Sequence, residues 1–218
     1  GKTSVLTRLV SLTSKEREHL VEELVKACAQ MSSTKTGALI SLEQGQDLSD
    51  YIKTGTSMNS QVSCELLCSI FQYGTPLHDG AVIIQGVKIA CAAAYFPPTT
   101  RELPTSYGAR HRAAVGISEI TDSITIVVSE ETGNISIAEN GDLKVYSVAQ
   151  LRSYLMERYQ IEAPSVKEEM VFHGEDTSAA DSDAAVEKDD YIPTQAVVVK
   201  LRSRRGNAKR RRKGSDRS

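Results

Sequence analysis

The sequence predicts an α/β domain of the α+β type, in which a central mixed, largely antiparallel β-sheet is flanked by helices. Short β-branched runs of strand length occur among amphipathic segments of helix length, without a repeating strand–helix–strand order. Several neighbouring strands are joined by short glycine-containing turns, which indicates hairpins and therefore antiparallel pairs. Tryptophan is absent and aromatic residues are few, so the core is predicted to be aliphatic.

The first half of the domain is predicted to contain two helices and one strand. A helix is expected to begin at Thr13-Ser14, where hydroxyl side chains precede a charged first turn, and apolar residues then recur at helical spacing. Gly37–Leu42 is predicted to be a strand. Residues 43–58, which are polar and punctuated by glycine, are predicted to be more loop than element. Ser63–Tyr73 is predicted to be a second helix.

A hairpin, a helix, a second hairpin and a closing helix are predicted next. The ranges are 81–84 and 87–94 for the first pair of strands, 109 to about 120 for the helix, 124–128 and 134–138 for the second pair, and 147–159 for the closing helix. Apolar β-branched runs mark the strands. Asn140-Gly141 marks a further tight turn.

The composition changes after Pro164, which predicts three segments. Residues 1–162 are predicted to be the folded domain. Residues 163–195 are rich in Glu, Asp, Ala and Ser, which predicts a flexible acidic linker. Residues 196–218 hold a short β-branched run and a basic tail, for which anionic lipid, nucleic acid and the linker itself are candidate partners beside a weakly interacting tail. No specific nucleic acid is expected, because the tail has no aromatic side chains on which bases could stack.

Three short polar clusters interrupt the apolar elements, and such breaks are typical of functional sites. The first cluster, Leu77–Ala81, places His78 and Asp79-Gly80 directly before a buried strand. A carboxylate, an imidazole and a glycine that permits the close approach of a ligand favour a site. The alternative is a tight Asp-Gly turn with a packed histidine.

The second cluster, Gly108–Ala114, opens a predicted helix with two arginines and a histidine. The positive end of the helix dipole disfavours cations in this turn. An anion bound to the free amides and the guanidinium groups would remove that penalty, so the pattern favours a phosphate site. The alternative is a solvated basic turn paired with Glu102 or Glu119.

The third cluster, Ser129–Gly133, follows a β-branched strand and contains Glu130 and Glu131. Consecutive side chains at a strand end point to opposite sides, so at most one carboxylate is expected to face a given site. Oxygen ligands suit Mg²⁺ or Mn²⁺, which also need substrate phosphates. A solvent-facing acidic turn is the alternative. Together the three clusters offer ligands for a metal, a binding site for phosphate and a carboxylate.

In order and spacing these motifs resemble the diadenylate cyclase domain, above all its membrane-type form, which makes cyclic di-AMP from two ATP molecules. The resemblance extends from about Leu20 to about Tyr159. It is carried by LHDGAVII (77–84), GARHRAAVGISE (108–119) and VSEETGNIS (128–136), with SCELLCSIF (63–71) and AAYFP (93–97). It implies the diadenylate cyclase fold, one ATP per domain, and a homodimer in which two domains face each other.

The resemblance also implies roles for individual residues. The implied catalytic residues are Asp79, Gly80, Arg110 and His111, with Asp79 near the attacking ribose 3′-hydroxyl. The implied ligands of Mg²⁺ or Mn²⁺ are His78, Asp79 and Glu131. The implied ATP-binding residues are Asp79, Gly80, Ala81, Tyr95, Phe96, Gly108, Ala109, Arg110, His111, Arg112, Ser129 and Glu130. Tyr95 and Phe96 are implied to line the adenine pocket.

One position departs from the family pattern. Many relatives have threonine where Ala109 stands, and the threonine hydroxyl contacts the nucleotide. Its loss removes one hydrogen bond, worth about 0.5–1.5 kcal/mol. We expect weaker binding rather than inactivity.

The expected function is a diadenylate cyclase that condenses two ATP molecules into cyclic di-AMP and releases two pyrophosphates. The alternative is a catalytically weak or inactive ATP-binding regulatory module. A nucleic-acid-binding module would rest on the basic tail alone and would explain none of the three clusters. A membrane or a regulatory protein is a further candidate partner.

The expected location is the cytoplasmic side of a membrane. The sequence does not begin with Met, and no run reaches the ~18 apolar residues that a spanning helix needs. Relatives of membrane type carry membrane helices just upstream, so we expect this chain to be a cytoplasmic catalytic part anchored to the cell membrane by N-terminal helices. The cysteines lack a second ligand pair at zinc-site spacing and are expected to be reduced, buried thiols.

Overall fold

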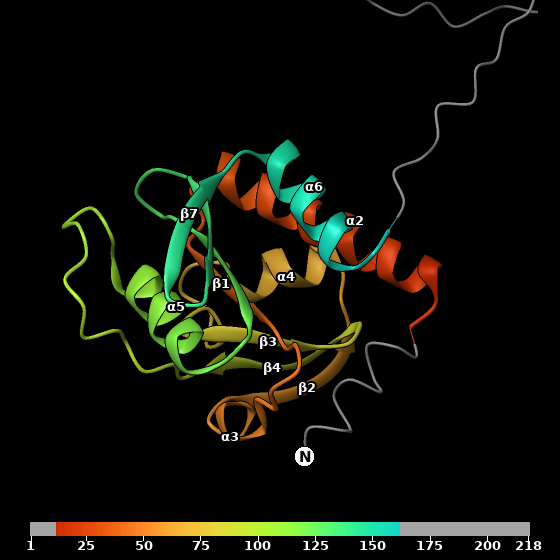
Figure 1. Cartoon of the computed structure of the whole chain (residues 1–218), viewed down its shortest axis with the longest axis horizontal. Coiled ribbons are helices and arrows are strands. Elements are labelled where there is room, and N and C mark those ends of the chain that lie inside the picture. The colour runs from red at the N-terminus through yellow and green to blue at the C-terminus, as the bar shows by residue number, and fades with distance from the viewer. Residues whose placement is uncertain (1–11, 162–218) are drawn as a thin grey trace, which may run out of the picture. The chain divides into compact units, whose positions relative to one another are not determined.

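The computed structural model describes residues 12–161 and confirms the predicted α/β class (Figure 1). Within these residues one mixed sheet has seven strands in the order β2-β4-β3-β1-β5-β6-β7. Neighbouring strands are antiparallel, except for β1 and β3, which are parallel. The predictions for 163–195 and 196–218 lie outside the described residues.

The predicted helices and strands are present close to their expected bounds, and three elements are additional. The strands are β1 (Ala38–Leu42), β2 (Thr56–Gln61), β3 (Ala81–Gln85), β4 (Lys88–Ala94), β5 (Ile124–Val128), β6 (Ile135–Glu139) and β7 (Asp142–Tyr146). The helices are α2 (Ser14–Ser33), α3 (Ser49–Ile52), α4 (Cys64–Ile70), α5 (Ala109–Ile120) and α6 (Val148–Arg158). None of these helices is long and apolar enough to cross a membrane.

The prediction that residues 43–58 are mainly loop is wrong, because α3 and most of β2 lie there. β2 pairs only with β4, at one edge of the sheet, and its side chains are mostly exposed. A register shift between Ser57 and Ser60 interrupts the pairing. An exposed edge strand does not require apolar alternation, so its polar sequence concealed it. The short strand β7, at the other edge, is likewise largely exposed.

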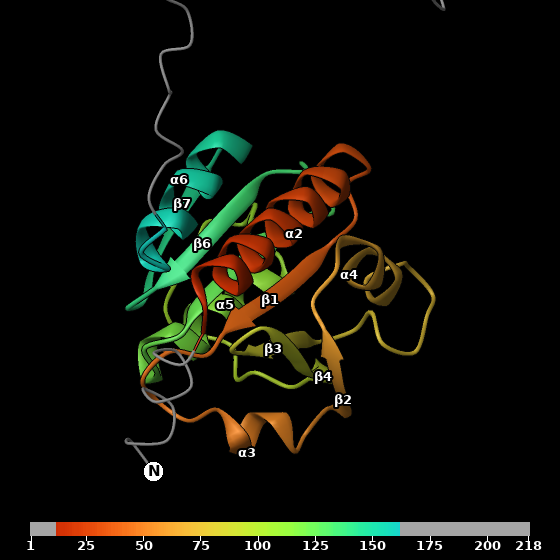
Figure 2. The same cartoon turned by 90° about the vertical axis from the view of Figure 1, so that its right-hand side faces the viewer.

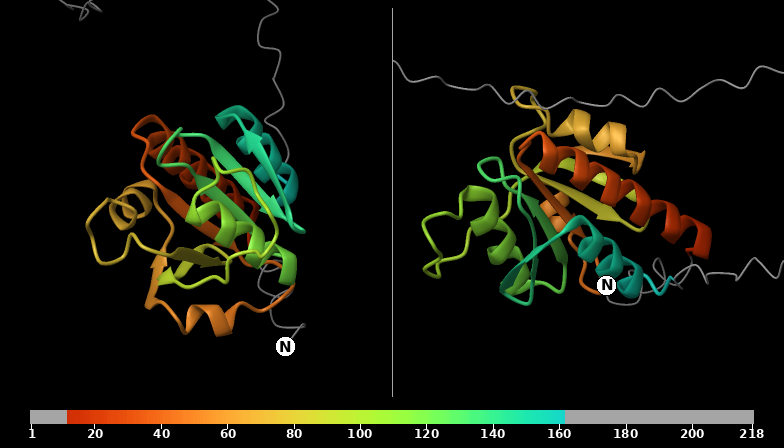
Figure 3. Two further views of the ribbon diagram at one scale, coloured as in Figure 1. Left: turned by 90° about the vertical axis from the view of Figure 1, so that its left-hand side faces the viewer. Right: turned by 90° about the horizontal axis from the view of Figure 1, so that it is seen from above.

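The two faces of the sheet are buried against different helices (Figures 2 and 3). Along β1, Ala38, Ile40 and Leu42 belong to the larger core, to which α2, α4 and α6 also contribute. Leu39 belongs to a smaller core that includes Ile117 of α5 and Leu48 beside α3. Successive side chains of a strand point to opposite faces, so β1 separates the two cores.

Side-chain caps determine where most of the long helices begin. Thr13 and Ser147 form capping boxes at the starts of α2 and α6, and Ser63 caps α4. By contrast, α5 begins at Gly108 without a side-chain cap. The amides of its first turn therefore have no capping side chain and are available to a ligand.

The four cysteines are free, as predicted. Cys28, Cys64 and Cys91 are buried, whereas Cys68 is only half-buried, so the expectation of four buried thiols is wrong at this position. Burial raises the pKa of Cys28 to about 12 and the pKa values of Cys68 and Cys91 to about 11. These three thiols are therefore protonated and weakly nucleophilic at neutral pH.

Candidate functional site

The three polar clusters meet at one end of the sheet. β1 and β3 run parallel. At the start of β1, Ala38 pairs with Val128 at the end of β5, and at the start of β3, Ala81 pairs with Ala94 at the end of β4. The segments that precede or follow these four residues are therefore neighbours. The clusters are far apart in the sequence, and the strand register brings them together.

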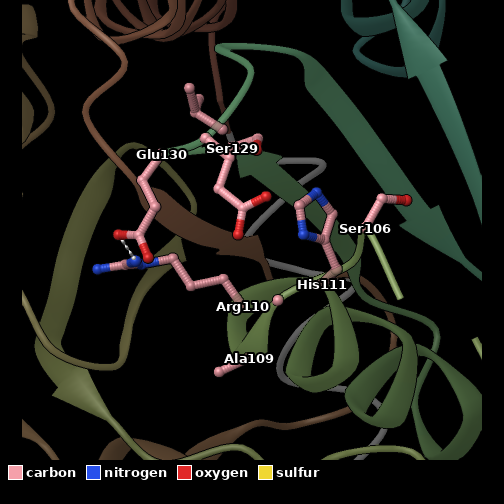
Figure 4. A pocket seen from close by; sticks show the side chains of 9 residues that line it. Ser106, Ala109, Arg110, His111, Ser129 and Glu130 are labelled. Carbon is pink, nitrogen blue, oxygen red and sulfur yellow. Dashed lines mark hydrogen bonds and ion pairs between the residues drawn. The ribbon is translucent and has the colours of Figure 1, made fainter. Parts of the chain in front are cut away.

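A narrow polar pocket lies between the first turn of α5 and the turn after β5 (Figure 4). Its volume is about 50 Å³. It is lined by Ser106, Gly108, Ala109, Arg110, His111, Val128, Ser129, Glu130 and Glu131. The expectation that only one of Glu130 and Glu131 faces a given site is wrong, because both line this pocket. β5 ends at Val128, so these carboxylates lie in a turn, where strand alternation does not apply.

A wider, mainly apolar pocket of about 260 Å³ adjoins the narrow one. It is lined by Leu39, Asp79, Gly80, Ala94, Tyr95, Phe96, Pro98, Ala109, Arg110 and Ala113. Phe96 is buried and packs edge-on against Tyr51, whereas Tyr95 is 65% exposed. Ala109 and Arg110 line both pockets, so they mark the junction between the polar and the apolar space.

Arg110 is held by two groups at this junction. Its Nη1 donates to Oε2 of Glu130 at 2.7 Å, and its Nη2 donates to the carbonyl oxygen of His78 at 3.4 Å. Arg110 is therefore not paired with Glu102 or Glu119, the two partners that a solvated basic turn would have used. Glu119 instead accepts from the Thr99 hydroxyl at 2.8 Å and lies 3.5 Å from Nη1 of Arg101.

His111 is buried, with 5% of its surface exposed. Its ring stacks on Tyr107, with 4.9 Å between the ring centroids. Burial lowers the pKa of His111, and the Glu131 carboxylate partly opposes this effect. The neutral imidazole is therefore favoured at neutral pH, and the first turn of α5 carries less positive charge than its sequence suggests.

The loop before β3 presents both an imidazole and a carboxylate. Nδ1 of His78 donates to the carbonyl oxygen of Thr75 at 2.5 Å, because a carbonyl can only accept, and this leaves the lone pair of Nε2 available to a cation. Asp79 is exposed and lines the wider pocket. Gly80 has a φ of 102°, and a Cβ there would lie 2.7 Å from the carbonyl oxygen of Ala94. Glycine is therefore required at this position.

The predicted metal ligands His78, Asp79 and Glu131 are not gathered into one cluster. Residues 12–161 contain no group of three or more His, Cys, Asp or Glu side chains that could hold a metal ion. However, Asp79 lines the wider pocket and Glu131 the narrow one. Mg²⁺ is commonly held by one or two carboxylates together with substrate phosphates. This donor set fits a cation that binds with a phosphorylated ligand, and does not fit a metal held by the protein alone.

Two of the predicted ATP-binding residues line neither pocket. Ala81 is buried within β3, and Arg112 is half-buried on α5. The sequence interpretation also missed several lining residues, which are Leu39, Ala94, Pro98, Ser106, Ala113 and Val128. Ser106 and Pro98 belong to the loop that leads into the arginine cluster. Their closeness to that cluster in the sequence could have indicated that they line the site. The others are small or apolar residues with no chemical signal of their own.

Comparison with known proteins identifies the same family that the motifs resemble. Residues 25–143 match the family described as "DAC: DisA bacterial checkpoint controller nucleotide-binding". A diadenylate cyclase of Listeria monocytogenes is 49% identical over 144 residues, and the cyclic di-AMP synthase CdaA of Bacillus subtilis is 46% identical over the same length. A diadenylate cyclase of Mycoplasma genitalium is 40% identical over 146 residues, which are 66% of this chain and 72% of that protein.

Solved structures agree with the sequence comparison. DacA from Staphylococcus aureus, determined as a double mutant, aligns with a TM-score of 0.65 at 46% identity and covers 66% of this chain and 98% of that one. A protein from Bacillus cereus, described as a hypothetical membrane spanning protein, aligns with a TM-score of 0.56 at 44% identity and covers 58% and 62% of the two chains. The matched region spans 53% of the Listeria and Bacillus subtilis proteins and 66% of this chain, so it is about half the length of these curated relatives.

Proposed function

This chain belongs to the diadenylate cyclase domain family, and from that premise we propose that it condenses two ATP molecules into cyclic di-AMP with release of two pyrophosphates. The proposal extends to this chain the activity for which its relatives from Listeria and Mycoplasma are named. The chain spans only about half of the Listeria relative, so the activity of the whole protein is part of the proposal.

The observation that carries the proposal is a pair of adjoining pockets, one lined mainly by apolar residues and the other holding charged and hydroxyl side chains. The wider pocket is apolar, with aromatic residues Tyr95 and Phe96, which suits a purine base. The narrow pocket lies at the uncapped start of α5, where amides, Arg110 and the helix dipole favour an anion. A nucleoside triphosphate has these two parts in this order.

We assign roles on this basis. Arg110 and the amides at the start of α5, with Ser129, would bind the triphosphate and neutralise charge as it develops on the leaving pyrophosphate. Asp79 would orient or deprotonate a ribose 3′-hydroxyl that attacks the α-phosphorus of the other ATP. The neutral imidazole of His111 would donate or accept one hydrogen bond without adding charge.

A divalent cation, Mg²⁺ or Mn²⁺, completes the proposal. Asp79 and Glu131, with Nε2 of His78 as a further candidate, would hold it together with phosphate oxygens. When bound, the cation would neutralise phosphate charge. Arg110 would share this task from the junction of the pockets.

Cyclisation requires two nucleotides that attack each other, and each domain offers one pair of pockets. We therefore propose that two copies of the domain face each other through the end of the sheet where Asp79 lies. Asp79 is exposed at the rim of the wider pocket, so its carboxylate is accessible to a nucleotide on a second copy. We further propose that this occurs at a membrane, supported by the description of the Bacillus cereus neighbour as membrane spanning.

The rate of product formation at increasing protein concentrations tests this proposal. The protein is incubated with ATP and Mn²⁺, and cyclic di-AMP and pyrophosphate are measured. We expect two pyrophosphates per cyclic dinucleotide, and a rate per protein molecule that rises with protein concentration until the dimer is formed. A rate per molecule that is independent of concentration, while the protein is a monomer, would contradict the face-to-face dimer. ATP binding without product would instead favour a regulatory module.

A further inference from the structure

A guanidinium group, a carboxylate and a glycine share one small space beside the two pockets. The side chain of Arg110 is 20% exposed and that of Glu130 is 62% exposed, and they form an ion pair at 2.7 Å. A Cβ built on Gly37, which is buried just before β1, would lie 2.6 Å from Nη1 of Arg110 and 2.9 Å from Oε2 of Glu130. The missing side chain of Gly37 therefore leaves the space that the ion pair fills.

The contacts at Gly37 differ from those at glycines that are packed against the backbone. At Gly80 and Gly116 an added Cβ would meet backbone atoms, so the backbone itself would have to move. At Gly37 it would meet only the ends of two flexible side chains. The φ of Gly37 is not positive, so alanine causes no backbone strain there. Alanine at Gly37 would therefore displace the Arg110 guanidinium while the fold is retained.

The Arg110 guanidinium is held by hydrogen bonds at two of its nitrogens, but the third nitrogen has no partner. Nη1 and Nη2 donate to Glu130 and to the His78 carbonyl, but the buried Nε has no hydrogen-bond partner. A buried donor without an acceptor costs free energy and calls for an explanation. Arg110 lines both pockets, so an anionic ligand oxygen at their junction would supply the missing acceptor.

We propose that Glu130 and Gly37 are positioning residues that hold the Arg110 guanidinium at the junction of the pockets, with Nε–H directed to a phosphate oxygen of the bound nucleotide. Glu130 then acts through Arg110 and does not itself contact ATP. A carboxylate facing a triphosphate would repel it, whereas the same carboxylate bound to Nη1 fixes the cation that attracts it. This inference rests on the proposed function, because it takes a nucleoside triphosphate as the ligand.

A double-mutant cycle separates positioning from direct contact. The dissociation constant of ATP with Mg²⁺ is measured for Glu130→Ala and Gly37→Ala, each alone and combined with Arg110→Ala. Loss of a held, charge-assisted hydrogen bond predicts that each single variant weakens binding by about tenfold. In the Arg110→Ala background, neither substitution should weaken binding further. A tenfold loss that persists without Arg110 would show direct contact and overturn the inference.

Matched variants control for charge and for the fold. Glu157→Ala removes an exposed glutamate of α6 that lies outside both pockets, and it should leave ATP binding unchanged. Glu130→Gln keeps an acceptor for Nη1 but loses the charge, so we expect a loss smaller than that of Glu130→Ala. Thermal unfolding midpoints of the Glu130 variants should match the parent, because this ion pair is largely exposed on the carboxylate side.

A second readout does not need ATP. The Nε–Hε NMR signal of Arg110 in the nucleotide-free protein should be distinct, and Glu130→Ala or Gly37→Ala should move it towards that of a solvated arginine. An unchanged signal in both variants would overturn the inference even if the protein bound no nucleotide. If ATP binds as predicted but no cyclic dinucleotide forms, the proposed function fails and the positioning role stands.

Discussion

The helices on the two faces of the sheet differ in how they begin and in which polar groups they bury. Beneath α2, α4 and α6, aliphatic side chains are packed together and each helix begins with a side-chain cap. The buried carboxylate of Glu23 on this face accepts from the Cys64 amide at 2.7 Å and from Lys26 at 3.0 Å. On the face that carries α5, the helix start has no side-chain cap and an imidazole is buried.

This difference separates stability from function. The start of α5 lacks the side-chain cap that the helices of the other face have, and a buried imidazole lies in its first turn; such breaks of local folding rules are expected at functional sites. Substitutions on the first face should therefore change the free energy of unfolding and leave ATP binding intact. Substitutions of the pocket-lining side chains at the start of α5 should do the reverse.

The largest expected effect is on the packed face. Leu24 is fully buried on α2, and Leu24→Ala should lower the free energy of unfolding by about 2–5 kcal/mol, because it removes buried methyl groups and leaves a cavity. Denaturant unfolding measures the change. Below the unfolding transition, the KM for ATP should equal that of the parent. A raised KM in the folded variant would show that the two faces are coupled.

Arg110→Ala should have the opposite profile. Removing a preorganised cationic donor at a phosphate site lowers kcat/KM by about 10²–10³. The free energy of unfolding should change little, because the main partner of Arg110, Glu130, is mostly exposed. Steady-state kinetics and denaturant unfolding of the same preparation give both values. Strong destabilisation with unchanged kinetics would show that Arg110 stabilises the fold and does not act on the nucleotide.

Glu23→Ala tests the polar part of the packed face. It leaves the buried Cys64 amide without its acceptor and should destabilise the protein by about 1–3 kcal/mol. The Cys64 amide and Lys26 lower the pKa of Glu23 below its usual value of 4.5. The folded state thus favours the ionised form, and its stabilisation is present above about pH 4.5 and is lost as the pH falls through the folded pKa.

The pH dependence provides the control for that prediction. Between about pH 5 and pH 3, the parent should lose more stability than the Glu23→Ala variant, because the variant has no such carboxylate to protonate. Equal losses in both proteins would mean that the Cys64 amide does not favour the charged form of Glu23.

The smallest expected effect concerns Ala109, which lines both pockets. Ala109→Thr would add the hydroxyl that the resemblance implies at this position. One hydrogen bond would tighten ATP binding by about 0.5–1.5 kcal/mol, which isothermal titration calorimetry can detect. Weaker binding would show that the junction has no room for the larger side chain.

The sequence predicted the packed part of the fold well, because apolar periodicity reports burial. The helix at Ala109–Ile120 and the strand at Ile124–Val128 have the predicted bounds. By contrast, β2 was missed because an exposed edge strand carries no apolar pattern. Side-chain caps at Thr13 and Ser147 could be anticipated from residue type, since capping depends on nearby residues.

The sequence indicated most of the residues that form the site, but it did not indicate which of them contact each other. The clusters that contain Asp79, Arg110 and Glu130 were identified by chemistry, but the pairing of Arg110 with Glu130 depends on where the ends of β1 and β5 meet. That register is a tertiary feature, so the sequence suggested nearer glutamates. Gly37 gave no signal, because its role is to leave space for side chains that arrive from two other elements.

Product analysis with ATP and Mn²⁺, for the parent and for Asp79→Asn, shows whether this chain makes cyclic di-AMP and whether the Asp79 carboxylate is needed. Asparagine keeps the shape of the side chain and removes the charge that would orient or deprotonate the ribose hydroxyl. We predict cyclic di-AMP from the parent, little or none from the variant, and similar unfolding midpoints for both, because Asp79 is exposed. No cyclic dinucleotide from a parent that binds ATP would contradict the proposed activity, and equal yields from both proteins would contradict the proposed role of Asp79.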